Sequence, residues 1–301
     1  MVPGSLTQDA QALYEPALGE DALIRLANIH VSYSLARGAS KKVLNGVNLT
    51  IRRGEFVALA GQTGCGKSTL LRLVLGAETP STGSVLVDGR EVVRPDRDRG
   101  YVPQKYSLFP DKTVLENITF GPEVEEFSLL TRLTPRFYQR RRKFRGEALH
   151  QLRRMGLHDS DAAKYPDQLS GGMQQRVAIA QALVMKPKIL LMDEAFSALD
   201  PGTRASMQKL IRRVWAETGM TILFVTHNIA EAVRLGTRVV VLAKDEQARA
   251  GEGSGVSHDI PVPAWEQIPD ALRPQEFARM VESVEEATGY SSSEDGEAGT
   301  G

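Results

Sequence analysis

Apolar and polar residues alternate along the chain in short blocks that predict strands and helices. Near the N-terminus, residues 22–33 form a β-like run, and residues 43–51 predict a second strand because apolar residues recur at every second position. Residues 56–60 are apolar without interruption, which is typical of a strand covered on both faces. This run leads into a glycine-rich loop, followed by an expected helix over 67–76. Between 104 and 169 the pattern is mainly helical.

The second half of the chain alternates regularly between the two periods. Two apolar runs of strand length are each bounded by segments with helical spacing. Strands that alternate with helices favour an α/β fold with a mostly parallel sheet. The expected strands are 189–192 and 221–226, and the expected helices are 172–185, 203–218 and 229–235.

Composition divides the chain into a leader, a main domain and a tail. Residues 1–20 are rich in Gly, Pro and Ala without a clear period, and we expect a flexible leader. The main domain is expected over 21–244. Residues 245–301 form an acidic tail rich in Gly and Ser, and its first part, 245–260, and its last residues are expected to be flexible. Apolar residues at helical spacing predict a short helix over 274–287 that packs on the domain surface.

Overall composition excludes several classes of protein. The 301 residues are 42% hydrophobic, which is enough for one large core or two small ones. Lys and Arg together number 37, as do Asp and Glu, so no net charge draws the whole chain to nucleic acid or anionic lipid. No apolar run approaches the roughly 20 residues that span a bilayer.

The N-terminus and the cysteine content indicate the compartment. Residues 1–4 do not lead from a basic region into an apolar stretch, so a secretory signal is not expected. The single cysteine, Cys65, cannot form an intramolecular disulfide, and a reducing compartment is the natural interpretation. These features indicate a cytosolic protein.

A phosphate-binding loop follows the buried strand at 56–60. Gly61, Gly66, Lys67 and Ser68 fit the pattern G-x-x-x-x-G-K-[ST], for which the chance of a random match is about one per cent. Its glycines let backbone N–H groups approach phosphate oxygens, Lys67 would reach the β- and γ-phosphates, and the Ser68 hydroxyl would bind Mg²⁺. The predicted cofactor-binding residues here are Gly61, Gln62, Thr63, Gly64, Cys65, Gly66, Lys67, Ser68 and Thr69.

Two carboxylates end the apolar strand at 189–192. Asp193 lies where a parallel sheet presents its carboxyl edge, and is predicted to hold Mg²⁺. Glu194 faces differently and can orient or deprotonate an attacking water. An acidic turn at the end of a strand is the structural alternative, and the phosphate loop upstream makes it the weaker one.

A third motif, residues 169–176 with the sequence LSGGMQQR, lies between these two. It resembles the signature motif of ATP-binding cassette (ABC) ATPases. Tyr33 resembles the aromatic residue that stacks on adenine, Gln104 the glutamine that senses Mg²⁺ and the γ-phosphate, and His227 the switch histidine of that family. The sequence SALD at 197–200 resembles its D-loop. The motifs occur in family order over about residues 22–243.

The resemblance implies a fold and a shared site. The implied fold is an α/β P-loop NTPase core with a mostly parallel sheet, an antiparallel β-subdomain on its N-terminal side and an inserted helical signature subdomain at about 105–185. Ser170, Gly171 and Gly172 open a helix, which makes an anion site. In the family this site closes on the γ-phosphate of ATP held by the opposite subunit, so two ATP molecules join two chains.

The resemblance also implies the roles of particular residues. Glu194, His227 and Lys67 would be catalytic, and Gln104 would join Ser68 and Asp193 at the Mg²⁺ ion. The chain departs from the family pattern in two places. Met173 replaces a glutamine of the signature, and Ala195 replaces the proline after the catalytic glutamate. Neither change removes a charge or donor aimed at phosphate, so activity is expected to survive.

The stretch 136–145 is the most basic part of the chain. A nucleic-acid patch, a phospholipid contact and a solvated helix face are open interpretations. The resemblance adds a fourth, because the helical subdomain of the family receives the coupling helices of the membrane subunits.

Three functions are compatible with an ABC cassette. A soluble ATPase acting on nucleic acid or ribosomes is the alternative to transport, but such proteins carry long coiled coils, zinc modules or two cassettes, none of which this sequence shows. A catalytically dead scaffold conflicts with the intact Lys67, Asp193, Glu194 and His227. Transport is therefore favoured, and residues 195–200 and 226–242 are similar to the nitrate/sulfonate/taurine import group.

Import implies a set of partners and a location. The expected partners are a second cassette, in a homodimer that sandwiches two ATP molecules, transmembrane permease subunits and, indirectly, an extracytoplasmic solute-binding protein. No nucleic acid is expected. The chain would lie at the cytoplasmic face of the inner or plasma membrane, held there by the permease.

Overall fold

The structure is a computed structural model that describes residues 21–34, 40–105, 107–126, 135–244 and 253–289. The predicted leader at 1–20 and the last residues of the predicted tail lie outside the described residues.

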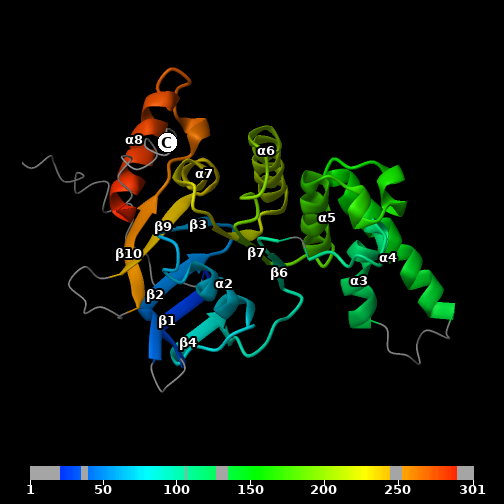
Figure 1. Cartoon of the computed structure of the whole chain (residues 1–301), viewed down its shortest axis with the longest axis horizontal. Coiled ribbons are helices and arrows are strands. Elements are labelled where there is room, and N and C mark those ends of the chain that lie inside the picture. The colour runs from blue at the N-terminus through cyan, green and yellow to red at the C-terminus, as the bar shows by residue number, and fades with distance from the viewer. Residues whose placement is uncertain (1–20, 35–39, 106, 127–134, 245–252, 290–301) are drawn as a thin grey trace, which may run out of the picture.

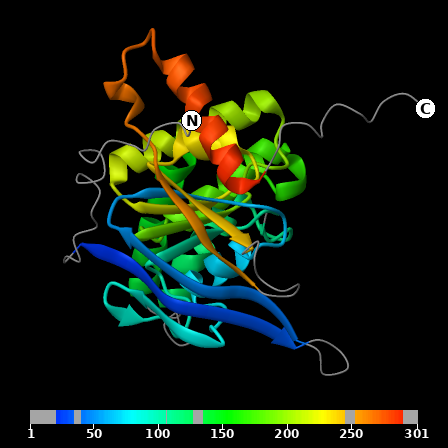
Figure 2. The same ribbon diagram turned by 90° about the vertical axis from the view of Figure 1, so that its left-hand side faces the viewer.

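The described strands form one ten-stranded sheet in the order β5-β4-β1-β2-β10-β9-β3-β8-β7-β6. The bounds are β1 Ala22–Ser34, β2 Ser40–Arg52, β3 Phe56–Ala60, β4 Thr82–Val87, β5 Arg90–Glu91, β6 Arg99–Val102, β7 Ile189–Asp193, β8 Thr221–Val225, β9 Arg238–Lys244 and β10 Ser254–Pro261. The five strands from β9 to β6 are parallel to one another. β1, β2, β4 and β5 pair antiparallel on the other side, below β10 in Figure 2.

Helices cover the sheet and extend beyond it. They are α2 Lys67–Leu75, α3 Val114–Glu126, α4 Pro135–Arg154, α5 Gly171–Leu183, α6 Pro201–Thr218, α7 Ile229–Leu235 and α8 Arg273–Thr288, with short 3₁₀ helices at 159–163, 166–168 and 265–267. α3, α4 and α5 pack on one another and form a separate group to the right of the sheet in Figure 1. This arrangement is the predicted α/β P-loop NTPase fold with an antiparallel β part and a helical insert.

The central strands follow from uninterrupted apolar runs. Every residue of β3, β7 and β8 is buried, as expected of strands covered on both faces. α2 ends where Gly76 adopts a left-handed φ of 83°, the conformation that glycine adopts without strain. α6 begins at Pro201, earlier than the periodicity predicts, because the Asp200 side chain accepts a hydrogen bond from the Thr203 N–H and caps the helix.

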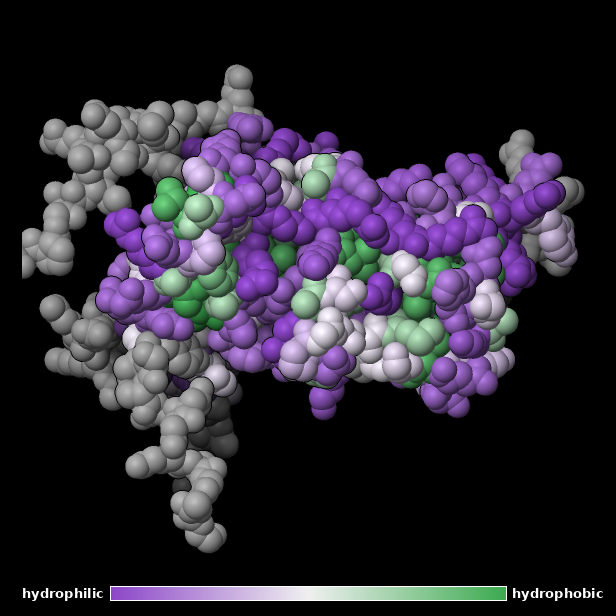
Figure 3. Space-filling model, turned by 90° about the horizontal axis from the view of Figure 1, so that it is seen from above, coloured by the Kyte–Doolittle hydropathy of each residue, from purple (hydrophilic) through white to green (hydrophobic). Residues whose placement is uncertain are grey.

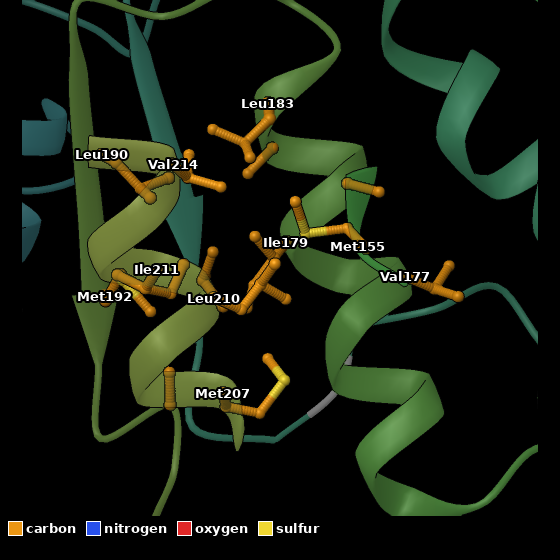
Figure 4. Packing of buried hydrophobic residues seen from close by; sticks show 14 of the residues in the cluster. Met155, Val177, Ile179, Leu183, Leu190, Met192, Met207, Leu210, Ile211 and Val214 are labelled. Carbon is orange, nitrogen blue, oxygen red and sulfur yellow. The ribbon is translucent and has the colours of Figure 1, made fainter. Parts of the chain in front are cut away.

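The largest cluster of buried apolar side chains joins the helical group to the sheet. Residues of α5, α6 and β7 interdigitate there, as Figure 4 shows for Ile179, Ile211 and Met192. A second cluster lies between α2, the parallel strands and the antiparallel strands. The helical group is therefore attached to the sheet through this cluster, beside the strand that ends in Asp193.

The prediction that residues 245–260 are flexible is wrong for the part that the structure describes. β10, Ser254–Pro261, pairs antiparallel with β9 along its whole length. The strand is held by backbone hydrogen bonds, and most of its side chains are exposed or half-buried. A hydropathy pattern therefore gives no sign of it.

The C-terminal helix α8 covers the middle of the sheet, at β9 and β10. α8 packs on α7, β9 and β10, with Val284 fully buried and the rings of Trp265 and Phe277 5.6 Å apart. Residues 253–289 thus complete the main domain, since they cover apolar side chains of α7 and β9.

Among the residues described, no helix has the length and apolar character that crossing a membrane requires.

Replacing Ile211 by alanine tests the packing between α6 and the rest of the core. Ile211 is fully buried, so Ile211→Ala is expected to lower the free energy of unfolding by about 2–5 kcal/mol in urea denaturation. Lys209→Ala, at an exposed position of the same helix, is the control and should change this free energy by less than about 0.5 kcal/mol. Equal effects of the two substitutions would contradict the packing described.

Candidate active site

The predicted motifs meet at one edge of the sheet because three neighbouring strands run in the same direction. β3 pairs parallel with β8, and β8 with β7, so their carboxyl ends lie side by side. The glycine loop follows β3, Asp193 ends β7, and His227 comes two residues after β8. The Glu194 N–H donates to the Val225 carbonyl at 3.0 Å, which extends the pairing to the point where the chains leave the sheet.

Two glycines of the loop are required by the space around them. Gly61 has a φ of 137°, and a Cβ there would lie 2.2 Å from the carbonyl oxygen of Leu242. Gly66 has a φ of 98°, and its Cβ would lie 2.5 Å from the Leu44 side chain. These values explain the glycines at both ends of the motif, since the backbone passes too close to its neighbours for a side chain.

Lys67 is almost wholly buried inside the loop. Its Nζ donates to the carbonyls of Gly61 at 2.6 Å and Gln62 at 3.0 Å, and lies 3.7 Å from Cys65 Sγ. No ion pair to a carboxylate is formed by this ammonium within the part of the chain that the structure describes. Its positive charge is thus held at the centre of the loop, where an anion could use it.

The Ser68 hydroxyl and Asp193 are brought together as the sequence predicts. The Ser68 hydroxyl donates to Asp193 Oδ1 at 2.8 Å, and Asp193 is itself almost fully buried. The Tyr101 hydroxyl donates to the other oxygen, Oδ2, at 3.4 Å. Burial, together with the negative charge of Asp193, raises the pKa of Tyr101, so the phenol stays protonated and can donate.

Glu194 lies at the centre of a second group. Gln104 Nε2 donates to Glu194 Oε2 at 2.8 Å, and His227 Nδ1 lies 3.7 Å from the same oxygen. The side chain of His227 is 55% exposed and that of Glu194 25%, so both can meet a ligand that arrives from solvent. Gln104 therefore contacts Glu194, and the structure shows no direct hydrogen bond between Gln104 and Asp193.

The backbone of Glu194 is in an unfavourable conformation. Its φ of 47° is left-handed, and this conformation costs a residue other than glycine on the order of 1 kcal/mol or more. Two hydrogen bonds stabilise the turn, since the Ser197 N–H and hydroxyl both donate to the Glu194 carbonyl, at 3.1 and 2.9 Å. Strain of this kind is typical of residues whose side chain must be aimed at a site.

Tyr33, the predicted adenine-stacking residue, lies near the end of β1 and is 37% exposed. Its hydroxyl donates to Glu78 Oε2 at 2.8 Å and lies 3.5 Å from Thr69 Oγ1 in the first turn of α2. Arg72 binds the other Glu78 oxygen at 2.7 Å. The ring is thus fixed at the side of the helix that follows the phosphate loop.

The signature residues are placed elsewhere in the chain. Ser170 caps α5 by accepting the Met173 N–H at 3.4 Å, and Gly171 and Gly172 open the helix and are partly exposed. A Cβ at Gly172 would lie 2.6 Å from the Thr203 methyl group at the start of α6. α5 packs on α3, α4 and β6, whereas α2 packs on β4, β7 and β8, so the two helix starts belong to different parts of the fold (Figure 1).

The donor set fits a magnesium ion that is shared with phosphate. Ser68 and Asp193 supply a hydroxyl and a carboxylate, and oxygen ligands of this kind are what Mg²⁺ prefers. Within the described ranges, no group of three or more His, Cys, Asp or Glu side chains could hold a metal by itself. Mg²⁺ commonly takes one or two protein ligands and completes its shell with phosphates and water, so these two residues are sufficient.

Some residues of the site could not be found from the motifs. Tyr101 reaches Asp193 because β6 pairs with β7, and Glu78 reaches Tyr33 across the loop after α2. Glu231 accepts the Thr226 hydroxyl at 2.5 Å and so fixes the turn that carries His227. Tyr101 and Glu78 lie in no recognisable pattern, and only the packing of separate elements shows their contacts. Glu231 lies in the stretch 226–242, but its contact with Thr226 was not predicted.

Comparison with known proteins agrees with this geometry. A family model described as ABC transporter matches residues 44–197, about half of the chain. The chain is 45% identical over 205 residues to an ABC transporter ATP-binding protein of Methanocaldococcus jannaschii, covering 68% of this chain and 72% of that protein. It is 40% identical over 221 residues to the taurine import ATP-binding protein TauB of Jannaschia, covering 73% and 77%.

A further relative is longer than this chain. The nitrate import ATP-binding protein NrtC of Synechococcus elongatus is 41% identical over 226 residues, which are 75% of this chain and 32% of that protein. The chain thus spans about a third of the length of that relative.

Solved structures give the same result. A dimeric ABC transporter cassette superposes with a TM-score of 0.66 at 32% identity, covering 80% of this chain and all of that one. A dimeric cassette in a post-hydrolysis state bound to ADP and phosphate gives a TM-score of 0.64 at 31% identity. The resemblance predicted from the motifs is confirmed, and the chain belongs to the ABC transporter family, as an ATP hydrolase coupled to transport.

Proposed function

We propose that two copies of this chain bind two ATP molecules between them and energise a separate membrane permease that imports a small solute of the nitrate, sulfonate or taurine kind. An extracytoplasmic protein would deliver that solute, and the cassettes would lie on the cytoplasmic face of the membrane. Relatives named as nitrate and taurine import ATP-binding proteins support the import direction. Other relatives are named as import ATP-binding proteins for spermidine and for sulfate. The choice of solute therefore rests on the similarity of residues 195–200 and 226–242 to the nitrate/sulfonate/taurine group.

One observation carries the shared site. The chain has two anion-binding features, the loop around Lys67 and the helix start at Ser170, and they lie on different parts of the fold. A single nucleotide cannot occupy both within one copy unless the fold is rearranged. Two copies facing each other can pair the loop of one with the helix start of the other, and the dimeric cassettes of similar structure support this arrangement.

The binding step uses groups that the geometry already orients. Backbone N–H groups of residues 61–66 and the positive end of α2 would surround the phosphates, and Lys67 would exchange its two carbonyl partners for the β- and γ-phosphate oxygens. Ser68 and Asp193 would hold Mg²⁺, with Gln104, which contacts Glu194, as a third proposed ligand. The ion would neutralise developing charge on the phosphates. Tyr33 would stack on adenine.

The hydrolysis step depends on Glu194. Its carboxylate would accept a proton from the water that attacks the γ-phosphorus, while His227 donates a hydrogen bond to a γ-phosphate oxygen. The Gln104 amide, which binds the same carboxylate oxygen, would orient the glutamate. Cleavage would remove the γ-phosphate that links the loop of one chain to Ser170 of the other. Hydrolysis would therefore favour dissociation of the two chains.

Replacing Glu194 by glutamine tests the role of the carboxylate in hydrolysis. Glu194→Gln removes the base and keeps the shape of the side chain, so ATP turnover is expected to fall by about 10²–10⁴-fold while binding persists. The variant should accumulate as an ATP-bound dimer in light scattering with saturating Mg-ATP. Glu217→Gln, an exposed carboxylate on α6, is the control and should behave like the unmodified chain. A Glu194→Gln variant that stays monomeric under these conditions would count against the shared site.

Replacing Lys67 by alanine tests the phosphate loop itself. Lys67→Ala removes the buried ammonium that would bind the β- and γ-phosphates, and ATP affinity measured by calorimetry is expected to fall by about 10²-fold or to become undetectable. Lys209→Ala, an exposed residue of α6, should leave the affinity unchanged. Unchanged affinity in Lys67→Ala would refute the assignment of the loop.

A further inference from the structure

The N-terminal half of α4 is strongly basic. Residues 136–145 include five arginines and one lysine and contain no acidic residue, in a chain whose total charge is zero. The acidic side chains nearest in sequence are Glu147 on α4 itself and those of α3, which packs beside α4. Whether these cations are neutralised therefore depends on which side chains the neighbouring carboxylates pair with.

Three carboxylates of α3 are paired with arginines, two of them from the basic stretch itself. Glu126 pairs with Arg140, and Glu123 with Arg141 at 3.3 Å. Glu125 pairs with Arg97 at 3.4 Å, outside α4. On α4 itself, Glu147 pairs with Lys186 at 3.3 Å. Two further carboxylates, Glu116 and Asp159, line a hollow together with Arg145. They are engaged by Thr113 and by Arg153.

Among the described side chains of this stretch, three cations remain, namely Arg142, Lys143 and Arg145, which we call the basic face. All three are exposed, and none forms a salt bridge with any residue in the described part of the chain. The segment that joins α3 to α4, residues 127–134, contains no acidic residue that could pair with them. The basic face is a local surplus of positive charge on a neutral protein.

An exposed aromatic residue lies on the same surface. Tyr138 is 70% exposed, and residues 138, 142 and 145 follow each other at spacings of four and three, which places them on one stripe of the helix. Lys143 lies beside this stripe, about a quarter turn from Arg142 around the helix. α4 belongs to the helical group that projects away from the sheet, and that end of the molecule is mostly hydrophilic (Figure 3). Ring and cations together match the headgroup region of a bilayer, where tyrosine and Lys or Arg are both favoured.

We propose that the basic face binds the anionic lipid headgroups of the membrane in which the permease lies. The inference rests on the proposed function only for the membrane location. Each Lys or Arg that approaches an anionic surface raises partitioning about fivefold, so the three cations together supply about 10²-fold. That strength suits a secondary, reversible contact that orients the helical group and adds to the hold of the permease. Recognition of single-stranded nucleic acid relies on a row of stacking aromatics, and the face offers one ring.

Vesicle sedimentation with the full chain tests the proposal. The probes are vesicles of phosphatidylcholine alone and of phosphatidylcholine with about one third phosphatidylglycerol, at low and high salt. The unmodified chain should bind the anionic vesicles selectively and lose this binding at high salt, because the Debye length shortens. The triple variant Arg142→Gln, Lys143→Gln, Arg145→Gln should partition about 10²-fold less.

A matched triple variant controls for total charge. Arg25→Gln, Arg90→Gln, Lys209→Gln removes the same charge from exposed positions on β1, β5 and α6, and should bind like the unmodified chain. Equal loss in the two triple variants would overturn the proposal, because the contact would then depend on net charge alone. Selective binding of an RNA homopolymer in place of anionic vesicles would overturn it too, as would dependence of permease association on the face in purely zwitterionic membranes.

The readout is separate from the active site. The three side chains lie on the helical group, whereas Lys67 and Asp193 lie at the sheet edge, so ATP binding by the triple variant is expected to equal that of the unmodified chain. A loss of vesicle binding with intact ATP binding supports the lipid contact. Failure of ATP-dependent dimerisation with intact vesicle binding would reject the proposed function and leave the lipid contact standing.

Discussion

The parallel pairing of β3 with β8 and of β8 with β7 is the constraint on which the site depends. Because the three strands run in one direction, the loop that holds Lys67, the carboxylate of Asp193 and the turn before His227 all leave the sheet at the same edge. The hydrogen bond of 2.8 Å from Ser68 to Asp193 shows how closely that register joins segments 125 residues apart in sequence. Burial of all three strands on both faces gives this edge a rigid base.

The rest of the fold adds parts that this edge cannot supply. The antiparallel strands bring Tyr33 to the side of α2, and the helical group carries Ser170 at the start of α5. Those two parts differ in their attachment. The antiparallel strands belong to the sheet itself, whereas the helical group is attached to it by side-chain packing with α6 and β7. In the proposed dimer, a second copy would complete the anion site that begins at Ser170. The same projecting group carries the basic face of α4, so contact with the membrane and closure of the dimer would act on one body.

Much of the site could be predicted because its residues lie in short continuous motifs. The glycine loop with Lys67 and the strand ending in Asp193 were placed correctly from spacing and hydropathy. Tyr101 could not be found, because its contact with Asp193 depends on the register of β6 against β7. β10 was missed for a related reason: backbone hydrogen bonds to β9 hold it, and its side chains carry no apolar alternation. A hydropathy pattern indicates which residues are buried. The position of β10 and the contact of Tyr101 depend instead on which strands pair and in which register.

The most direct test of the shared site asks which chain touches the γ-phosphate of a bound nucleotide. A cassette with an intact loop is mixed with a size-tagged Lys67→Ala cassette, both in a form that cannot hydrolyse ATP, and an ATP analogue with a photoreactive group on its γ-phosphate is added. The account predicts that light transfers the label to the tagged chain near Ser170, although that chain cannot bind nucleotide alone. Label found only on the chain whose own loop holds the nucleotide would contradict it.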